Sequence, residues 1–341
     1  MNATAPQASA PAQSTAPAPS GIWITEVLRL TRWELYLAWR RAMAKVLIIL
    51  LVVFYAITIG FLCFVTAQII NQPLQTGQCP PNVVGCQEPS QQDLERERAA
   101  EITPLTDQLT FPTSLGFAAS FTRVAGLILI CILAGALVGS EYGYSTQRLA
   151  FSRGTSRLQM LTAQGLALAV ISMVVAAGML ALGALVGVIV GPAFGLAISA
   201  PSFGGWMEIF KFFLAFAFSL FAYTIVALGA ATLGKSTAAG IGLALGYIVL
   251  EFILSGILSG IGQILTAAGN STGQMLQHIP DWFLGNNVGA VMGHAGQYPI
   301  GLAADPGPDL TLARTLIVSL IYCAVFVGGS YLLLSRRDVT E

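Results

Sequence analysis

The sequence predicts an all-α integral membrane protein, because the chain is too apolar and too poor in charge for a soluble fold. Of its 341 residues, 55% are hydrophobic and 9% are charged, and its mean hydropathy is +0.74. Soluble domains carry about 25% charged residues. A helix needs about 20 apolar residues to cross a hydrocarbon core of about 30 Å, and helices satisfy their own backbone hydrogen bonds there. Six runs are long enough, at about 46–70, 117–140, 158–191, 209–233, 237–265 and 312–335.

The chain divides into a tail, a short helix and a six-helix domain. Residues 1–21 carry no charge and consist mostly of Ala, Pro, Ser, Thr and Gln, a composition that favours disorder. They lack the basic start and the apolar run of a secretory signal, so we expect the first span to be retained. Residues 46–341 form the predicted six-helix transmembrane domain.

Residues 22–45 predict an amphipathic helix that lies in the membrane interface. Trp and Tyr favour the headgroup level, and basic residues favour an anionic inner leaflet. A plain cytoplasmic extension of the first span is the alternative. One face of this helix carries Ile24, Val27, Leu28, Thr31 and Leu35, and the other carries Arg29, Arg32, Trp33, Tyr36 and Arg40.

The distribution of positive charge predicts that both termini are cytoplasmic. Most of the sixteen Lys and Arg residues fall on one side of the predicted spans, and Lys and Arg concentrate in cytoplasmic loops. The opposite side holds most of the acids, together with Arg96, Arg98, Arg123, Lys211 and Arg314. This topology gives three external stretches, at about 71–116, 192–208 and 266–311.

Two cysteines in the first external stretch are candidates for a disulfide. Cys79 and Cys86 flank a turn with Pro and Gly, and an oxidising exterior permits a bond between them. Two free thiols are the alternative, because the spacing fits either arrangement. The nearby run 93–100 has alternating charges and predicts a short exposed helix.

The stretch 139–161 marks the sharpest change of polarity in the chain. The second apolar run stops at Glu141, and Ser145 and Arg148 follow at helical spacing, which predicts a helix that continues past the membrane surface. The result is a short, Arg-rich hairpin on the cytoplasmic side. It either docks a soluble partner or serves only as a positively charged anchor.

The same stretch resembles the loop of type-2 ABC transporter permeases between their second and third spans. The rest of the layout agrees, with an interfacial helix, six spans, the Pro-containing stretch 278–282 and the basic tail 336–338. Ser145 stands where Gly is common in that family, and Gln164 where Lys is common. The residues that carry the resemblance are Gly139, Ser140, Glu141, Thr146, Arg148 and Arg157.

The resemblance implies a permease subunit of an ABC exporter, coupled through this loop to a separate ATP-binding subunit. The implied coupling residues are Glu141, Thr146, Arg148, Arg153 and Arg157. It further implies a second permease half, either another copy or a different chain, and a place in the cytoplasmic membrane of a prokaryote. ATP and Mg would be bound by the partner, so we expect no catalytic residue, no cofactor and no metal on this chain, and no nucleic-acid partner. The alternative function is a non-transporting scaffold or sensor with ligand-binding external loops.

One segment matches a nucleotide-binding motif by its letters alone. Residues 229–236, GAATLGKS, fit the phosphate-loop pattern, but that loop must follow a strand and open a helix of an αβ domain. These residues end the fourth predicted span. We therefore predict an internal turn in which Gly234 breaks the helix and Lys235 lies at the inner surface.

Glu251 is an acid deep in a predicted span. A charge at that depth costs about 3 kcal/mol on insertion scales, so we expect it to face the bundle interior. It either lines a cavity or a dimer interface, or makes a helix-packing hydrogen bond. The histidines, His278 and His294, lie in the last external stretch without a ligand spacing that supports a metal site.

Pairs of glycines four residues apart predict close helix packing within the spans. They are Gly135 and Gly139, Gly183 and Gly187, Gly242 and Gly246, and Gly256 and Gly260.

Overall fold

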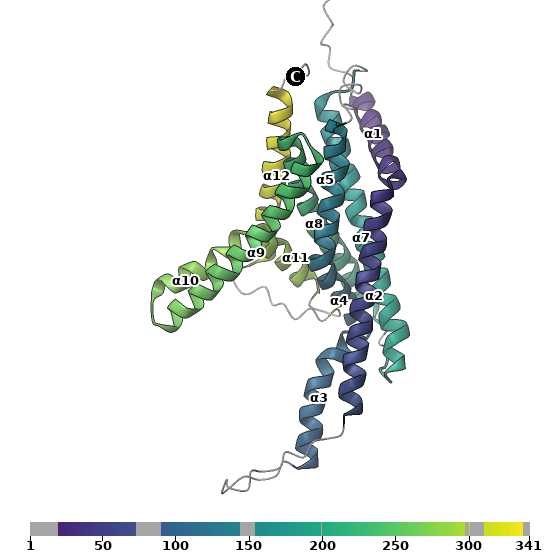
Figure 1. The fold of residues 1–341 in the computed structure, drawn as a ribbon, viewed down its shortest axis with the longest axis vertical. Helices are drawn as coiled ribbons and strands as arrows, with labels where there is room; N and C mark the ends of the chain where they lie inside the picture. The colour runs from purple at the N-terminus through teal and green to yellow at the C-terminus, as the bar shows by residue number, and fades with distance from the viewer. Residues whose placement is uncertain are drawn as a thin grey trace, which may run out of the picture.

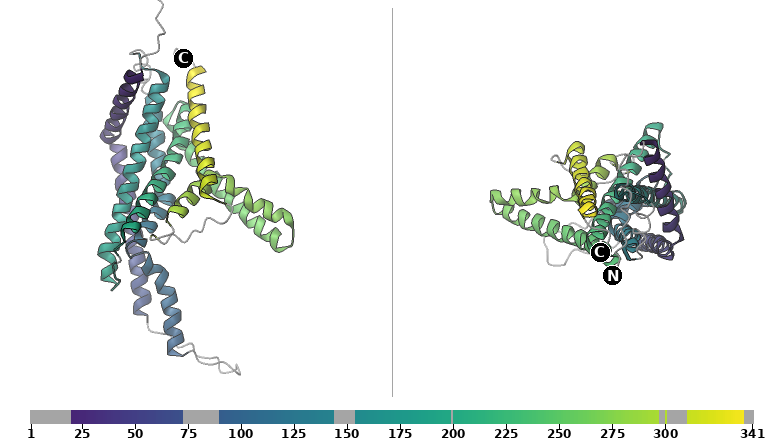
Figure 2. Two further views of the ribbon diagram at one scale, coloured as in Figure 1. Left: turned by 180° about the vertical axis from the view of Figure 1, so that it is seen from behind. Right: turned by 90° about the horizontal axis from the view of Figure 1, so that it is seen from above.

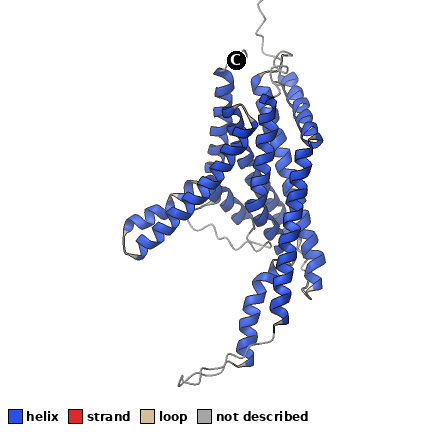
Figure 3. Cartoon of the chain, viewed as in Figure 1, coloured by secondary structure: helices blue, strands red, loops and turns tan. Residues whose placement is uncertain are grey.

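The computed structural model describes residues 20–72, 90–143, 154–198, 200–296, 300 and 310–336. Within these ranges the chain is all-helical and contains no strand (Figure 3). The candidate disulfide of Cys79 and Cys86 lies outside the described residues.

The helices follow one another along the chain as shown in Figure 1. The first half contains α1 (Ser20–Arg40), α2 (Ala42–Asn71), α3 (Gln91–Asp107), α4 (Thr113–Phe121), the π-helical turn η1 (Thr122–Gly126), α5 (Leu127–Gly143) and α7 (Arg157–Ala193). The second half contains α8 (Phe203–Gly234), α9 (Thr237–Ala267), α10 (Ser271–His278), the 3-10 turn η2 (Pro280–Trp282), α11 (Leu284–Gly296) and α12 (Leu312–Arg336).

Six helical segments of the described chain are long and apolar enough to cross a membrane. Each of the six runs predicted from the sequence lies inside one of them, which confirms the number and the position of the spans and indicates a multi-pass membrane protein. The segments are α2, the continuous stretch from α4 through α5 (Thr113–Tyr142), α7, α8, α9 and α12.

Helix α8 is the centre of the bundle. It packs against α5, α7, α9, α11 and α12, and Phe212, Phe216 and Leu220 on it are fully buried. A helix that is apolar all round is expected in such a central place. Helix α9 is equally apolar but mostly exposed: its first half packs on α5 and α8, and its second half leaves the bundle with α10 (Figure 1).

Helices α1, α5 and α12 meet the same end of the bundle, called here the terminal end, because α1 begins there and α5 and α12 end there (Figures 1 and 2). At the opposite end α2 and α3 form a hairpin. Arg98 of α3 donates hydrogen bonds to the carbonyls of Ile69 and Ile70 in the last turn of α2 and to that of Gln72, the residue after the helix, at 2.8 Å. A cation is favourable at a helix C-terminus. The exposed helix predicted over 93–100 is thus the longer α3.

Helix α1 is separated from α2 by a bend. Arg41 has extended backbone angles (φ −71°, ψ 126°), so the helical hydrogen bonds do not continue across it. Helix α1 packs along α7 with a buried stripe of Val27, Thr31, Glu34 and Ala38. The aromatic side chains Trp33, Tyr36 and Trp39 are exposed, as a helix in the membrane interface requires. The interfacial placement of this helix stays a prediction.

The turn between α8 and α9 lacks the context of a phosphate loop. Helix α8 runs unbroken to Gly234, and Ser236 caps α9 by accepting a hydrogen bond from the backbone of Ala239. A turn between the two spans is confirmed, with one difference, and its place on the cytoplasmic side stays a prediction. The left-handed residue is Lys235 (φ 49°) and not Gly234.

The stretch 266–311, predicted as an external loop, contains two helices that the sequence reading did not resolve. Helix α10 folds back on the end of α9, and α11 packs between α8 and α12.

The paired glycines fall into two groups. Those of α5 and α7 lie close to the backbone of α9 and of the segment around α4, as close helix packing requires. The pairs on α9 face open space; they are Gly242, Gly246, Gly256 and Gly260.

Candidate functional site

The described residues bury two polar clusters among the helices. The terminal cluster consists of Glu34, Arg41, Glu141 and Gln164 and lies at the terminal end. The inner cluster consists of Arg123, Tyr223, Glu251 and Gly285 and lies deeper in the bundle. Each is described from its residues upward, since buried polar groups need partners to offset their lost hydration.

Glu141 lies in the last turn of α5 and is only 4% exposed. Its Oε2 atom accepts a hydrogen bond of 2.6 Å from Nε2 of Gln164 on α7. Helix α7 begins with a capping box in which Ser156 and Gln159 satisfy each other's backbone amides, and this fixed start sets the position of Gln164 two turns later. Glu141 is therefore a buried link between α5 and α7 and does not point into solvent.

Glu34 of α1 brings a second acid to the same place. Its carboxyl group is hydrogen-bonded to that of Glu141. Two carboxylates have no hydrogen between them, so this contact requires one shared proton. Burial raises the pKa of Glu34, while the hydrogen bond with Glu141 and the charge of Arg41 act in the opposite direction.

Arg41 joins the bend between α1 and α2 to α5. Its Nη1 donates to Oγ of Ser140 at 2.7 Å and to the carbonyls of Ala136 and Leu137 at 3.3 and 3.4 Å. Its positive charge also attracts both acids. The terminal cluster thus connects four helices through a single cation and two acids that share a proton.

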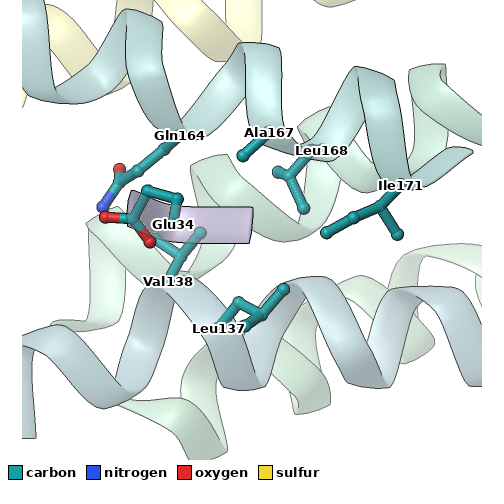
Figure 4. A pocket seen from close by; sticks show the side chains of 7 residues that line it. All are labelled: Glu34, Leu137, Val138, Gln164, Ala167, Leu168 and Ile171. Atoms are coloured by element: carbon teal, nitrogen blue, oxygen red, sulfur yellow. The ribbon is translucent and has the colours of Figure 1, made fainter. Parts of the chain in front are cut away.

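A small cavity of about 10 Å³ borders the terminal cluster, and Figure 4 shows the carboxyl group of Glu34 beside the amide of Gln164 at its edge. This volume holds about one water molecule. The cavity is therefore too small for a transported molecule. The terminal cluster is suited to join the helices that surround it and to bind a proton between its two acids. Its lining residues are Glu34, Leu137, Val138, Gln164, Ala167, Leu168 and Ile171.

Arg157, the first residue of α7, is engaged within the chain. Its Nη1 donates to the carbonyls of Leu334 and Ser335 in the last turn of α12, the latter at 3.0 Å, where a cation also favours the helix dipole. Thr146, Arg148 and Arg153 lie outside the described residues. The structure therefore places two of the five candidate coupling residues, Glu141 and Arg157, on either side of segment 144–153.

The sequence reading missed Glu34 as a member of this site. The spacing of the residues could have identified it. The buried stripe of α1 repeats at intervals of four, three and four residues, at Val27, Thr31, Glu34 and Ala38, so Glu34 lies on that stripe. Arg41 was counted only as a cytoplasmic charge, and its contact with α5 depends on how two distant helices pack.

The inner cluster is built around Glu251 of α9, which is 8% exposed. Its Oε2 accepts a hydrogen bond of 2.9 Å from the hydroxyl of Tyr223 on α8, and its Oε1 accepts one from the backbone N–H of Gly285 on α11. These are the contacts that the packing interpretation of Glu251 expects. Arg123 of η1 donates to the carbonyl of Gly285 at 3.1 Å and is attracted electrostatically to Glu251.

Arg123 was counted with the external charges, although it falls inside the predicted run 117–140. It lies inside the second span, in a π-helical turn (Thr122–Gly126). Such a turn inserts one extra residue into a helix and is frequent at functional sites. Arg123 in this turn reaches the carbonyl of Gly285 on α11.

The two histidines make separate local contacts. Nδ1 of His278 is 3.0 Å from Oδ2 of Asp281, and Nε2 of His294 is 2.6 Å from the carbonyl of Leu310. No three His, Cys, Asp or Glu side chains of the described chain gather in a way that could hold a metal ion.

Comparison with known proteins yields one family. A family model described as "Protein of unknown function (DUF2705)" matches residues 115–340, which begin in α4 and include every later helix that the structure describes. No curated protein matches the chain.

Proposed function

The chain belongs to the DUF2705 family, and we propose that it is the membrane-spanning permease subunit of an ATP-driven transporter of the type-2 ABC exporter class. In this proposal the terminal end faces the cytoplasm of a prokaryotic cell, and segment 144–153 docks on a separate ATP-binding subunit. That subunit binds ATP and Mg. A second permease half, identical or different, completes the transporter.

The main support for this proposal is that the residues on both sides of segment 144–153 are fixed by contacts with other helices. On one side of it, Glu141 is tied to α1 and α7 through Glu34 and Gln164. On the other side, Arg157 is tied to the end of α12. A displacement of the segment would therefore move α1, α5, α7 and α12 together. A coupling element requires such a connection between one segment and several helices.

The roles of the candidate residues follow from this arrangement. Arg148 and Arg153, with Thr146, belong to the segment itself and would contact the ATP-binding subunit. Glu141 and Arg157 are held by contacts within the chain, so they would transmit the displacement. Closure of two ATP-binding subunits would push on both segments of the dimer and change which side of the membrane the bundle opens to.

The test is co-purification of the tagged chain with an ABC-type ATP-binding subunit expressed beside it. We expect the wild type to bind that subunit and to support ATP hydrolysis, and Arg148→Glu to reduce both by about tenfold or more, since it reverses a charge at a docking surface. Arg96→Glu on α3 is the matched control, because it makes the same change at the opposite end of the molecule.

The outcomes separate the two function classes. Loss of binding in Arg148→Glu but not in Arg96→Glu supports the permease. A wild-type chain that binds no ATP-binding subunit, while it stays folded and monodisperse in detergent, rejects it and favours the scaffold or sensor.

A further inference from the structure

Helix α11 is a short helix inserted among spans. Its 13 residues are fewer than the roughly 20 that a span needs. Leu284, Val288 and Met292 recur every four residues and are buried, and the helix packs on α8 and α12. Apolar packing along this stripe accounts for one face of α11, but it does not account for the charges that meet its first turn.

The first turn of α11 is held by an acid and a base from two different spans. Gly285 gives its backbone N–H to Glu251 of α9 and receives, at its carbonyl, a hydrogen bond of 3.1 Å from Arg123 of η1. The N-terminal N–H groups of a helix have no partner within the helix. A carboxyl group there is favourable both as an acceptor and for the helix dipole.

Two glycines of α11 make this approach possible. A Cβ on Gly285 would lie 2.6 Å from the hydroxyl oxygen of Tyr223, and a Cβ on Gly289 would lie 2.7 Å from Nη2 of Arg123. Both distances are too short for a real carbon atom. Since the residues are four apart, they form one face of α11 that is shaped for Tyr223 and Arg123.

The turn that precedes α11 is anchored separately. Nδ2 of Asn287 donates to the carbonyls of Asp281 and Phe283 at 2.8 and 2.7 Å, and the hydroxyl of Tyr322 on α12 donates to the carbonyl of Trp282. These contacts do not involve Arg123 or Glu251. The bonds of Asn287 join α11 to this turn, so the hydrogen bond from Tyr322 to Trp282 at 3.2 Å is the one that attaches segment 280–283 to α12 independently of Gly285.

We propose that Arg123 and Glu251 form a charge clamp that locks the first turn of α11 into the bundle, so that α11 is a movable helix hinged at 280–283. The clamp joins η1, α9 and α11, with Tyr223 of α8 holding the carboxyl group in place. The two charges attract each other, but they bond to Gly285 and not to each other. Removing one of two opposite buried charges leaves the other less compensated, which is unfavourable. An opposite pair of this kind suits a helix that must be either docked or released. The inference concerns contacts within this chain and does not rest on the proposed transport function.

The test is hydrogen–deuterium exchange of the purified chain, reconstituted in lipid nanodiscs without any partner. Glu251→Gln keeps the size of the side chain and removes its charge. We expect exchange of the α11 amides to rise about tenfold, the effect of losing one charge-assisted hydrogen bond, while α7 stays unchanged. Glu208→Gln on α8 is the matched control, because it breaks an exposed ion pair with Lys211.

The double variant distinguishes a clamp from two unrelated contacts. If Arg123 and Glu251 act together, Arg123→Gln combined with Glu251→Gln should release α11 no further than either change alone. Additive increases would overturn the proposal. So would unchanged α11 exchange in Glu251→Gln, or an equal rise in all helices, which would indicate a general loss of stability.

Discussion

The terminal cluster and the inner cluster both bury acids between helices, but their charges are balanced differently. The terminal cluster contains Glu34 and Glu141 with Arg41, and two carboxyl groups in contact favour one shared proton. The inner cluster contains Glu251 and Arg123, one acid and one base. The terminal cluster can change its charge by taking up or losing a proton. The inner cluster depends on opposite charges that offset each other.

The two clusters also differ in how tightly they are packed. A cavity with room for about one water borders Glu34 and Gln164, so a lost hydrogen bond there can be replaced by water. Around Gly285, a Cβ would lie 2.6 Å from the hydroxyl oxygen of Tyr223, so there is no room even for a methyl group. The comparison indicates that the terminal cluster tolerates change and the inner cluster does not, and the predictions that follow test this difference.

The largest expected effect comes from removing the base of the inner cluster. Arg123→Leu leaves the carboxyl group of Glu251 buried without its opposite charge, so we expect a loss of about 3–5 kcal/mol in the free energy of unfolding. Glu141→Leu removes one of two acids and leaves Gln164 beside the cavity, where a water can accept its hydrogen bond. We expect that change to cost about 1 kcal/mol.

The measurement is denaturant unfolding of the purified chain in detergent, with both variants under one condition. A loss for Arg123→Leu no larger than that for Glu141→Leu would remove the proposed difference between the clusters.

A middle-sized effect is expected from adding one methyl group to the packed face of α11. Gly285→Ala places a carbon 2.6 Å from the hydroxyl oxygen of Tyr223, and overpacking of this kind costs about 1–3 kcal/mol. Gly256→Ala on α9 is the matched control, because that glycine faces open space and Ala is the better helix former. Thermal unfolding that ranks the control at or above the wild type, and Gly285→Ala below it, bears out the comparison; equal melting temperatures contradict it.

The six spans could be predicted from the sequence because the membrane imposes a length and an apolar composition on each of them. Every predicted run lies within a helix of the structure. Glu141 could be singled out because the apolar run stops at it. The turn at Lys235 followed from its place between two spans.

The partners of the buried charges could not be predicted in the same way, since they depend on which helix faces are adjacent. Glu34 and Glu141 are separated by more than a hundred residues, and so are Arg123 and Gly285. Helix α11 was missed because it is too short for a span and lies in a stretch that reads as a loop. Its apolar spacing of Leu284, Val288 and Met292 was the available signal. Arg123 was counted with the external charges although the predicted run 117–140 contains it, and the π-helical turn around it was not predicted.

The smallest expected effect is a pH dependence that belongs to the terminal cluster. Folding raises the pKa of Glu34 above its ordinary value of 4.5, so the folded chain holds this proton more tightly than the unfolded chain. The resulting stability is complete below about pH 4.5 and is lost as the pH rises through the raised pKa. Glu34→Gln stays neutral at every pH and keeps a hydrogen-bonding group toward Glu141.

The wild type and Glu34→Gln should therefore unfold at similar temperatures near pH 4.5 and diverge as the pH rises to about 8, where the variant becomes the more stable by about 1 kcal/mol, the worth of one hydrogen bond. Glu26→Gln is the control, since Glu26 lies on the same helix in an exposed ion pair with Arg29. Parallel curves for the wild type and Glu34→Gln would mean that Glu34 does not carry the shared proton. Because Glu251 bonds Tyr223 and Gly285 and not a second acid, Glu251→Gln should gain no stability over the same pH range, and this difference is the sharpest distinction between the two clusters.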